Sequence, residues 1–184
     1  MCFHAMPTKN LNNSERILSL VRRLKKTLPK FHDGRIDYTK ATLVPVVTCF
    51  IRFKDRILLM KRSSKARYYP KQWNTVAGHL DEIKLPENKA LDEVKEETGI
   101  TRGDIASVSR AKPFYLNDKK LKRRWLIFPV VAELKRKPKV RLNWEHTQFR
   151  WIRPNELGRF HHVEKLDESM KRVLEETKNL PGRY

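Results

Sequence analysis

The chain has 184 residues, 39% of them hydrophobic, which is enough for one hydrophobic core and is the usual size of a single domain. Its 41 Lys and Arg residues outnumber the 21 Asp and Glu residues, and the formal charge of +20 favours association with polyanions such as nucleotides or nucleic acid. Two cysteines are too few for a disulfide scaffold, and no apolar run is long enough for a transmembrane helix. The first residues lack the apolar run of a signal peptide, so we expect a cytoplasmic protein with no membrane partner.

An amphipathic helix is expected near the start of the chain, after 12 residues that we expect to be disordered. Asn13 or Ser14 can cap this helix, and Pro29 ends it. Apolar residues recur on one side at helical spacing, namely Ile17, Leu20, Val21, Leu24 and Leu28. We therefore divide the chain into an N-terminal extension with a basic helix, residues 1–40, and a main domain, residues 41–184.

Local signals then predict a hairpin, a short strand and a second helix. Residues 42–62 are rich in β-branched and aromatic residues on both sides of a tight turn. A loop over 63–73 leads to a short strand at 74–80. Pro86 suits the first turn of a helix and Gly99 suits its end, which predicts a helix over 86–98.

Further strands are expected near residues 105–111, 113–116, 124–134 and 148–152, followed by a final amphipathic helix over 161–180. The segment 124–134 is the most apolar and should be central, although Pro129 implies a bulge or an edge there. Strands and helices mix without regular alternation. The expected class is therefore α+β, or an α/β/α sandwich around a mixed sheet.

The helix at 86–98 carries three carboxylates that share one face. Glu93, Glu96 and Glu97 are spaced i, i+3, i+4, so they crowd together and repel one another unless a cation lies among them. Hard divalent cations with oxygen ligands, above all Mg²⁺ or Mn²⁺, suit such a group. The alternative is a solvated acidic face with lysine partners, and Lys89 lies one turn before Glu93.

This segment resembles the signature of the Nudix hydrolases, which reads G, five residues, E, seven residues, then R-E-U-x-E-E-x-G-U, where U is aliphatic. The resemblance spans residues 41–174 and includes the late segment "EHTQFRWIRPNEL". Seven of nine fixed positions match in register: Gly78, Glu93, Val94, Glu96, Glu97, Gly99 and Ile100. The resemblance implies the Nudix fold, an α/β/α sandwich with a mixed sheet.

The resemblance also implies roles for individual residues. Glu93, Glu96 and Glu97 match the metal-binding glutamates, and the carbonyl of Ala77 matches a further ligand. Glu145 resembles a late glutamate that binds metal or acts as a base. The implied reaction is the attack of water on a diphosphate linkage with Mg²⁺ or Mn²⁺ as cofactor. Glu93, Glu96 and Glu145 are the candidate catalytic residues, and either Glu93 or Glu145 can take the proton.

The two mismatches are Lys84, where the signature has Glu, and Asp92, where it has Arg. Both charges are inverted together, so we expect Lys84 and Asp92 to form a structural ion pair across the turn that enters the helix. Unrelated drift at two exposed positions is the alternative, because surface ion pairs contribute little.

Four residues are candidates for substrate binding. Lys61 and Arg62 follow the hairpin strand and can meet phosphates; the alternative is that they are exposed strand-end charges. Tyr69 and Trp73, in the loop before the signature, can stack on a base or ribose, and the alternative is packing under that loop. A nucleotide-like diphosphate is the expected substrate, and its exact kind is left open.

Two basic runs bracket the predicted central strand, "KKLKRR" at 119–124 and "KRKPKVR" at 135–141. At about 3.3 Å per residue they lie some 30 Å apart, too far to serve one small nucleotide. RNA or another long polyanion is therefore an alternative partner, and a catalytically weak Nudix-fold protein that binds RNA or nucleotides through its basic surface is the alternative function. The oligomeric state is left open, a homodimer included.

Overall fold

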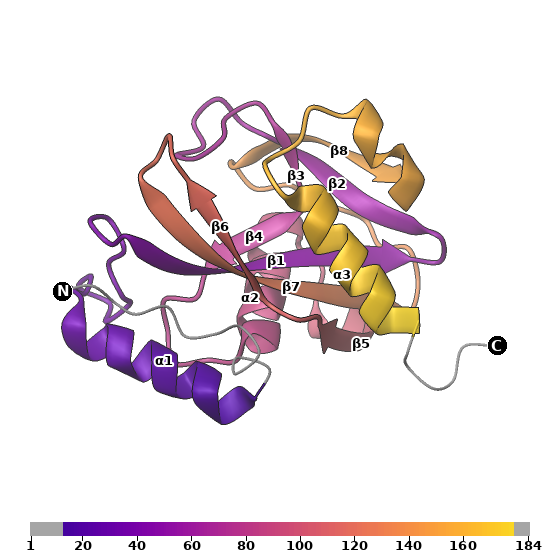
Figure 1. Ribbon diagram of the computed structural model, residues 1–184. Coiled ribbons are helices and arrows are strands. Elements are labelled where there is room, and N and C mark those ends of the chain that lie inside the picture. Colours follow the sequence, from indigo (N-terminus) through magenta and orange to yellow (C-terminus); the bar gives the residue numbers. More distant parts are fainter. Residues whose placement is uncertain (1–12, 179–184) are drawn as a thin grey trace.

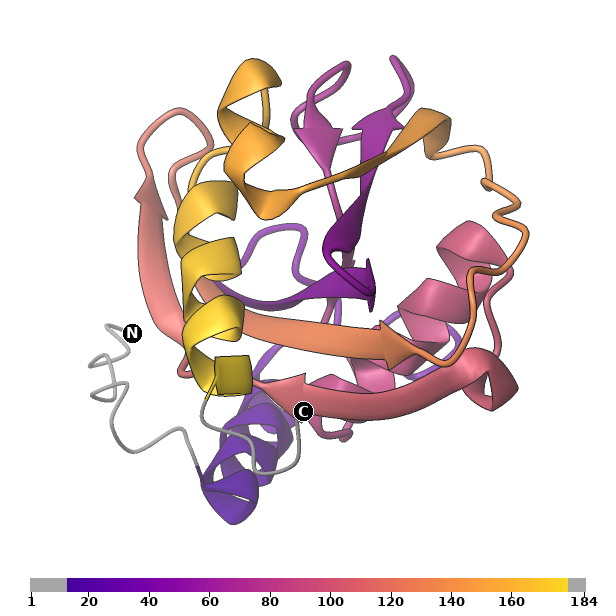
Figure 2. The ribbon, with the colours of Figure 1, turned by 90° about the vertical axis from the view of Figure 1, so that its right-hand side faces the viewer.

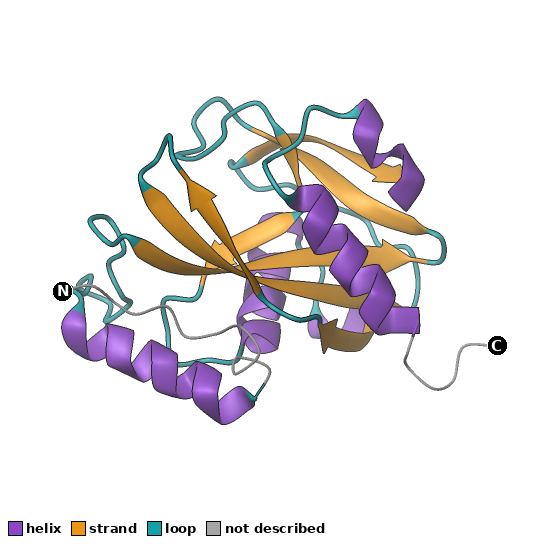
Figure 3. Cartoon of the chain, in the orientation of Figure 1, coloured by secondary structure: helices purple, strands orange, loops and turns teal. Residues whose placement is uncertain are grey.

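A mixed β-sheet lies between helices in the computed structural model, which describes residues 13–178 (Figure 1). The described elements are α1 (Ser14–Thr27), β1 (Leu43–Phe53), β2 (Arg56–Arg62), β3 (Trp73–Asn74), β4 (Val76–His79), α2 (Pro86–Thr98), η2 (Arg102–Asp104), β5 (Ile105–Arg110), β6 (Phe114–Asp118), β7 (Arg123–Leu134), β8 (His146–Ile152), η3 (Pro154–Arg159) and α3 (Leu166–Lys178). Helices α2 and α3 lie on opposite sides of the sheet (Figure 2). The expected mixed sheet with helices on both faces is thus confirmed, and Figure 3 shows how the strands dominate the middle layer.

One edge of β1 is shared by two strands, β2 and β4, and this arrangement positions the strand that carries the candidate site. The strands follow the order β3-β2-β1-β7-β5, and β1 and β7 are parallel while the other pairs are antiparallel. One edge of β1 pairs with β2 at Arg52 and then with β4 from Cys49 to Val46. At the fork, the Thr75 hydroxyl donates to the Cys49 carbonyl at 2.6 Å. This contact fixes the chain between β3 and β4, so β4 is held beside β1 at its start.

Strand β7 is central, as its apolar sequence predicts. It pairs with β1 on one side and with β6 and then β5 on the other. Pro129 lies where the partner changes, since β6 reaches Ile127 and β5 begins opposite Val130. The proline has no N–H to donate, and it occupies the interruption where none is needed. The basic runs at 119–124 and 135–141 flank the two ends of this strand.

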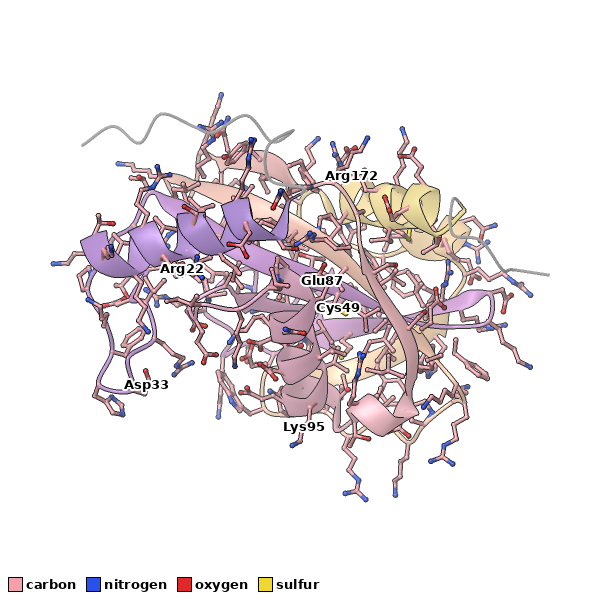
Figure 4. The ribbon with its side chains drawn as sticks, turned by 90° about the horizontal axis from the view of Figure 1, so that it is seen from below. Arg22, Asp33, Cys49, Glu87, Lys95 and Arg172 are labelled. Atoms are coloured by element: carbon pink, nitrogen blue, oxygen red, sulfur yellow. The ribbon has the colours of Figure 1, made fainter. Side chains whose placement is uncertain are left out.

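Helix α1 packs onto the main core through the apolar face that its spacing predicts. Asn13 caps it, because its side chain accepts a hydrogen bond from the Glu15 N–H at 2.8 Å. The buried residues of this helix belong to the same hydrophobic cluster as residues of β1, β7 and α2: Ile17, Leu20, Val21 and Leu24. Arg22 faces away from that cluster, and Asp33 lies on the outer loop after the helix (Figure 4). The division of the chain at residues 40 and 41 stays a prediction.

The final helix begins at Leu166 and not at residue 161, where its periodicity placed it. The backbone before it pairs instead with β3: the Trp73 N–H donates to the His161 carbonyl, and the Val163 N–H donates to the Trp73 carbonyl, both at 2.9 Å. This pairing holds residues 161–163 extended, which prevents them from joining the helix. No helix within residues 13–178 is long and apolar enough to cross a bilayer.

Candidate active site

Strand β4 and helix α2 bring the signature residues together. Gly78 lies opposite Val47 in the β1–β4 pair, and the side chain of Glu93 packs directly on its backbone. A Cβ atom at position 78 would lie 2.3 Å from the Glu93 carboxylate. Gly78 is therefore required for close approach of helix and strand. The helix ends at Gly99, whose φ of 70° is the left-handed conformation that glycine adopts without strain.

Glu97 is the most buried of the three glutamates, with 1% of its surface exposed. Its Oε1 accepts a hydrogen bond from the Ala77 N–H at 3.3 Å, whereas its Oε2 has no hydrogen-bond partner among the described residues. Burial raises the pKa of Glu97 well above its usual range, and the carboxylates of Glu93 and Glu145 raise it further. Within residues 13–178, no Lys or Arg side chain forms an ion pair with this carboxylate, and the guanidinium of Arg62 acts on it only at longer range.

The nearest candidate cation for Glu97 is a histidine that does not supply one. His146 Nδ1 lies 3.6 Å from Glu97 Oε2, and the imidazole is fully buried. Burial, with a smaller contribution from the guanidinium of Arg62, lowers the pKa of His146 to about 4. The imidazole is thus neutral at pH 7 and leaves the negative charge of Glu97 uncompensated.

Glu93 has a built-in cationic partner in the buried Lys89. Lys89 Nζ lies 2.9 Å from Glu93 Oε1 and 3.1 Å from Asp81 Oδ1. Asp81 in turn faces Arg35 Nη1 at 3.6 Å. The i, i+4 spacing of Lys89 and Glu93 is visible in the sequence, but the burial of Lys89, and its contact with Asp81, depend on the folded turn before α2.

The carboxylates fit a divalent cation by their chemistry. Glu96 is exposed and, like Glu93, lines a cavity in the protein. Glu97 has one carboxylate oxygen without a hydrogen-bond partner among the described residues. Carboxylate oxygens are the ligands that Mg²⁺ and Mn²⁺ prefer. Within residues 13–178, no three acidic, histidine or cysteine side chains already converge on one metal position. The residues that would hold a metal ion are Glu93, Glu96, Glu97 and the carbonyl of Ala77.

Lys84 and Asp92 touch. Lys84 Nζ lies 3.0 Å from Asp92 Oδ2 and 3.1 Å from Glu82 Oε2. The two ends of the pair are 38% and 55% exposed, so water screens the attraction. Glu82 also lies 3.8 Å from Lys89 Nζ. A chain of ion pairs therefore runs from Asp92 through Lys84, Glu82 and Lys89 to Glu93.

A cavity of about 310 Å³ opens beside the carboxylates and contains several predicted site residues. Arg62, Tyr69, Glu93, Glu96 and Glu145 line it, together with Ala77. Arg62 Nη2 faces Glu145 Oε2 at 3.8 Å, so β2 and the loop before β8 meet at the same wall.

Two predicted substrate residues lie elsewhere. Lys61 and Trp73 are not among the residues that line the cavity. They oppose each other in the β2–β3 pair, and the Trp73 ring packs edge-on against Phe160 with centroids 5.1 Å apart. This packing is in line with the alternative interpretation of Trp73, and the substrate-binding role of both residues stays a prediction.

The cavity also has walls beyond the four candidate substrate-binding residues. His79 and Trp125 line it beside Tyr68, and the ring centroids of the three lie 5.3 to 6.2 Å apart. Burial lowers the pKa of His79 to about 4, so its ring is neutral at pH 7. Trp144 is 65% exposed and lines the cavity next to Glu145. These residues come from separate elements, and only an apolar or aromatic character was visible in the sequence.

Comparisons with known proteins identify the family and the fold. The family model of the NUDIX domain matches residues 42–177, well over half of the chain. The fold is similar to that of a Caenorhabditis elegans Ap4A hydrolase, with a TM-score of 0.60, 19% identity, and coverage of 74% of this chain and 99% of that chain. It is also similar to a MutT protein from Methanosarcina mazei, with a TM-score of 0.58, 24% identity, and coverage of 76% and 99%.

A third similar structure is the NUDIX domain of Shewanella oneidensis NrtR, complexed with ADP ribose; its TM-score is 0.61 and its identity 14%, with coverage of 75% of this chain and 90% of that chain. A comparison with curated protein sequences gave no match. Because the family model covers most of the chain, and the folds agree, the chain belongs to the Nudix hydrolase superfamily.

Proposed function

We propose that this Nudix pyrophosphohydrolase cleaves the pyrophosphate linkage of a nucleoside diphosphate derivative by attack of water, with Mg²⁺ or Mn²⁺ as cofactor. The observation that carries the proposal is the buried Glu97, whose Oε2 has no hydrogen-bond partner among the described residues and lies among further carboxylates. Such a group is stable as an anion only with added positive charge. The names of two structural neighbours, which refer to Ap4A and ADP ribose, support a substrate with linked phosphates.

A divalent metal ion held by these carboxylates would neutralise the charge of the diphosphate and lower the pKa of water. The chain itself supplies the base and the anchor. Glu145 lines the cavity, and among the described residues its carboxylate has only a 3.8 Å contact with Arg62, which leaves it available to take the proton of the attacking water. Glu93 is instead held by Lys89, which suits a ligand better than a base. A new O–P bond forms as the anhydride P–O bond breaks, and the leaving phosphate keeps the electron pair.

Arg62 is the proposed phosphate anchor. Its Nε donates to the Tyr68 carbonyl at 2.9 Å, which fixes the guanidinium at the cavity wall. The long contact with Glu145 leaves Nη2 available to a phosphate oxygen, and a planar guanidinium binds such oxygens in pairs. Lys61 does not line the cavity and is therefore not part of the proposed phosphate anchor.

The test is a panel of nucleoside diphosphate derivatives incubated with Mg²⁺ or Mn²⁺, with the products identified by chromatography. The panel contains nucleotide sugars, nucleoside triphosphates, dinucleoside polyphosphates and capped RNA. Glu97→Gln should abolish cleavage, and Glu175→Gln, the same change on the exposed side of α3, should leave it intact. Full turnover by Glu97→Gln would contradict the metal assignment. A panel without any cleavage, together with strongly salt-dependent RNA binding, would favour the non-catalytic alternative.

A further inference from the structure

The N-terminal extension reaches the candidate active site, although it lies outside the family match at residues 42–177. Residues 29–39, which follow α1, form a compact loop in which the Asp37 N–H donates to the Pro29 carbonyl at 2.8 Å. Arg35 belongs to this loop and lines the cavity. Any contribution that this loop makes to the site therefore comes from outside the matched domain.

The loop is bonded to the segment that joins β4 to α2. The Ile36 N–H donates to the Asp81 carbonyl at 2.9 Å, and the buried Tyr38 hydroxyl donates to the Leu80 carbonyl at 2.8 Å. On its other side the loop is held by the start of β7, because the Arg123 guanidinium donates to the Tyr38 carbonyl at 2.9 Å. The extension thus fixes the backbone that carries the Asp81 side chain.

A series of alternating charges runs from this loop to the signature helix. Asp33, on the outer loop (Figure 4), accepts a hydrogen bond from Arg35 Nε at 2.7 Å, and Arg35 Nη1 lies 3.6 Å from Asp81 Oδ2. Lys89 Nζ lies 3.1 Å from Asp81 Oδ1 and 2.9 Å from Glu93 Oε1. The Arg35 side chain is 49% exposed, whereas those of Asp81 and Lys89 are 9% and 8% exposed. Water therefore screens the outer end of the series and leaves the inner contacts strong.

Lys89 is shared between two carboxylates, one of which also contacts Arg35. A buried carboxylate such as that of Asp81 requires positive charge beside it. While Arg35 supplies part of that charge, Lys89 remains available to Glu93. Without Arg35, Asp81 would draw Lys89 toward itself, and the Glu93 carboxylate would lose its fixed orientation. The contact with Lys89 uses Oε1 of Glu93, so a metal ion can bind through Oε2.

We propose that Arg35 is a positioning residue of the metal site: by neutralising Asp81 it keeps Lys89 on Glu93, and so fixes the carboxylate that would bind the metal ion. Partners that lie behind the direct ligands of a metal ion commonly orient those ligands, and their loss typically reduces metal affinity by about 10- to 100-fold. This inference rests on the proposed function for the role of Glu93 as a metal ligand, and it adds the extension to the parts of the chain on which the site depends.

The experiment measures Mn²⁺ binding by calorimetry without substrate, so that it does not depend on hydrolysis. Arg35→Ala should weaken binding about 10-fold. Arg35→Lys, which keeps the positive charge, should retain most of the affinity. Arg22→Ala is the matched control, because Arg22 lies on α1 of the same extension, faces away from the core and has a 3.9 Å contact with Glu15 (Figure 4). This control should leave the affinity unchanged.

Asp81→Asn tests whether the influence of Arg35 passes through Asp81. In this background Arg35→Ala should have no further effect on Mn²⁺ binding, because the carboxylate that it neutralises is absent. A merely structural role of Arg35 would give the same loss in both backgrounds and would overturn the proposal. If Arg35→Ala does not fold, Arg35→Gln, which keeps a long polar side chain, gives the same comparison.

Two further results would contradict the proposal. Tighter Mn²⁺ binding in Arg35→Ala would show that the guanidinium only repels the cation. Unchanged binding would remove Arg35 from the metal site, and a raised KM would then assign it to the substrate instead. Weaker Mn²⁺ binding in a protein that cleaves no diphosphate would support this inference while removing the proposed function; cleavage with a Mn²⁺ affinity independent of Arg35 would do the reverse.

Discussion

Lys84 Nζ lies 3.0 Å from Asp92 Oδ2, across the turn that leads into α2. The Nudix signature has charges of the opposite sign at these two positions, and in this chain the two reversed charges form an ion pair. Both side chains are largely exposed, so the pair contributes little to the free energy of folding, and its main effect is on the geometry of the turn. The turn can therefore be closed by either polarity, provided that both members change together.

Lys84→Glu should cost more than the loss of one surface ion pair, because the new carboxylate would face both Asp92 and Glu82. We expect a decrease of about 1 kcal/mol in the free energy of unfolding. The double variant Lys84→Glu/Asp92→Arg should recover most of this loss. Urea unfolding of the two single variants and the double variant measures the coupling, and a coupling energy of zero would show that the contact has no structural role.

Lys89 should matter far more for stability than Lys84. It is buried between Asp81 and Glu93, and its loss would leave Glu93 without its cation and Asp81 with only the longer contact to Arg35. We expect Lys89→Met to lower the free energy of unfolding by about 3 kcal/mol in EDTA. Added Mg²⁺ should restore part of the loss, because it can replace the missing positive charge.

The control for Lys89→Met is Lys95→Met, at the exposed end of the same helix (Figure 4). This change should alter the free energy of unfolding by less than about 0.5 kcal/mol. Equal effects of the two substitutions, measured by urea unfolding with and without Mg²⁺, would refute the role of Lys89 as an internal cation.

Gly78→Ala should disable the site without destroying the fold. Its new Cβ would lie 2.3 Å from the Glu93 carboxylate, so Glu93 must move. Displacement of a catalytic group by about 1 Å can reduce the rate about 100-fold. We expect a loss of that size in kcat with a circular dichroism spectrum like that of the wild type. Gly158→Ala is the matched control, because a Cβ at that position meets no atom within 4 Å; loss of activity there as well would show that the effect is not specific.

The stability of the metal-free protein should depend on pH through two buried groups, whose contributions to stability change with pH in opposite directions. Burial lowers the folded-state pKa of His146 to about 4 from an ordinary 6.5, so its stabilising contribution is complete above pH 6.5 and is lost as the pH falls toward 4. At about 1.4 kcal/mol per unit, this amounts to about 3 kcal/mol. Glu97 has a raised pKa, so its contribution is complete below 4.5 and is lost as the pH rises through its folded-state pKa.

Single substitutions separate these two effects. His146→Gln should flatten the decline in stability between pH 6.5 and 4, and Glu97→Gln should remove the decline on the alkaline side. His32→Gln, on the exposed loop after α1, should change neither slope. Thermal unfolding at a series of pH values in EDTA measures all three; an unchanged acid slope in His146→Gln would show that another group dominates.

Much of the fold could be predicted because its signals are local. Pro86 and Gly99 bound α2 where their backbone preferences place them, and the hairpin of β1 and β2 follows from β-branched residues around a tight turn. The start of the final helix could not be predicted in this way. Its periodicity includes Val163, whose backbone is instead bonded to Trp73, about 90 residues away. Tertiary pairing overrides local periodicity at that point.

The site shows the same division between local and non-local information. Glu93, Glu96 and Glu97 were visible because a helix brings residues three and four apart to one face. The cavity walls were not, because Asn74, His79 and Trp125 lie in β3, β4 and β7, and these strands come together only through their pairing with β2 and β1. Spacing in one element could not indicate that Trp73 would turn toward Phe160 while its neighbour Asn74 lines the cavity.

Trp144 should report on ligand binding. Its indole is 65% exposed at the cavity wall beside Glu145, and a large exposed ring next to a binding cavity is a stacking surface for a flat ligand. We expect AMP or ADP ribose to quench tryptophan emission. Trp144→Phe should remove a clear part of that change, since Trp125 also lines the cavity, and should weaken affinity about 2- to 10-fold, as loss of one stacking contact would. Trp151→Phe is the control, since Trp151 is in β8 and does not line the cavity. If the quenching were lost in Trp151→Phe and kept in Trp144→Phe, the exposed ring would not face the ligand. Glu145 beside it would then lose its assigned place at the reacting phosphate.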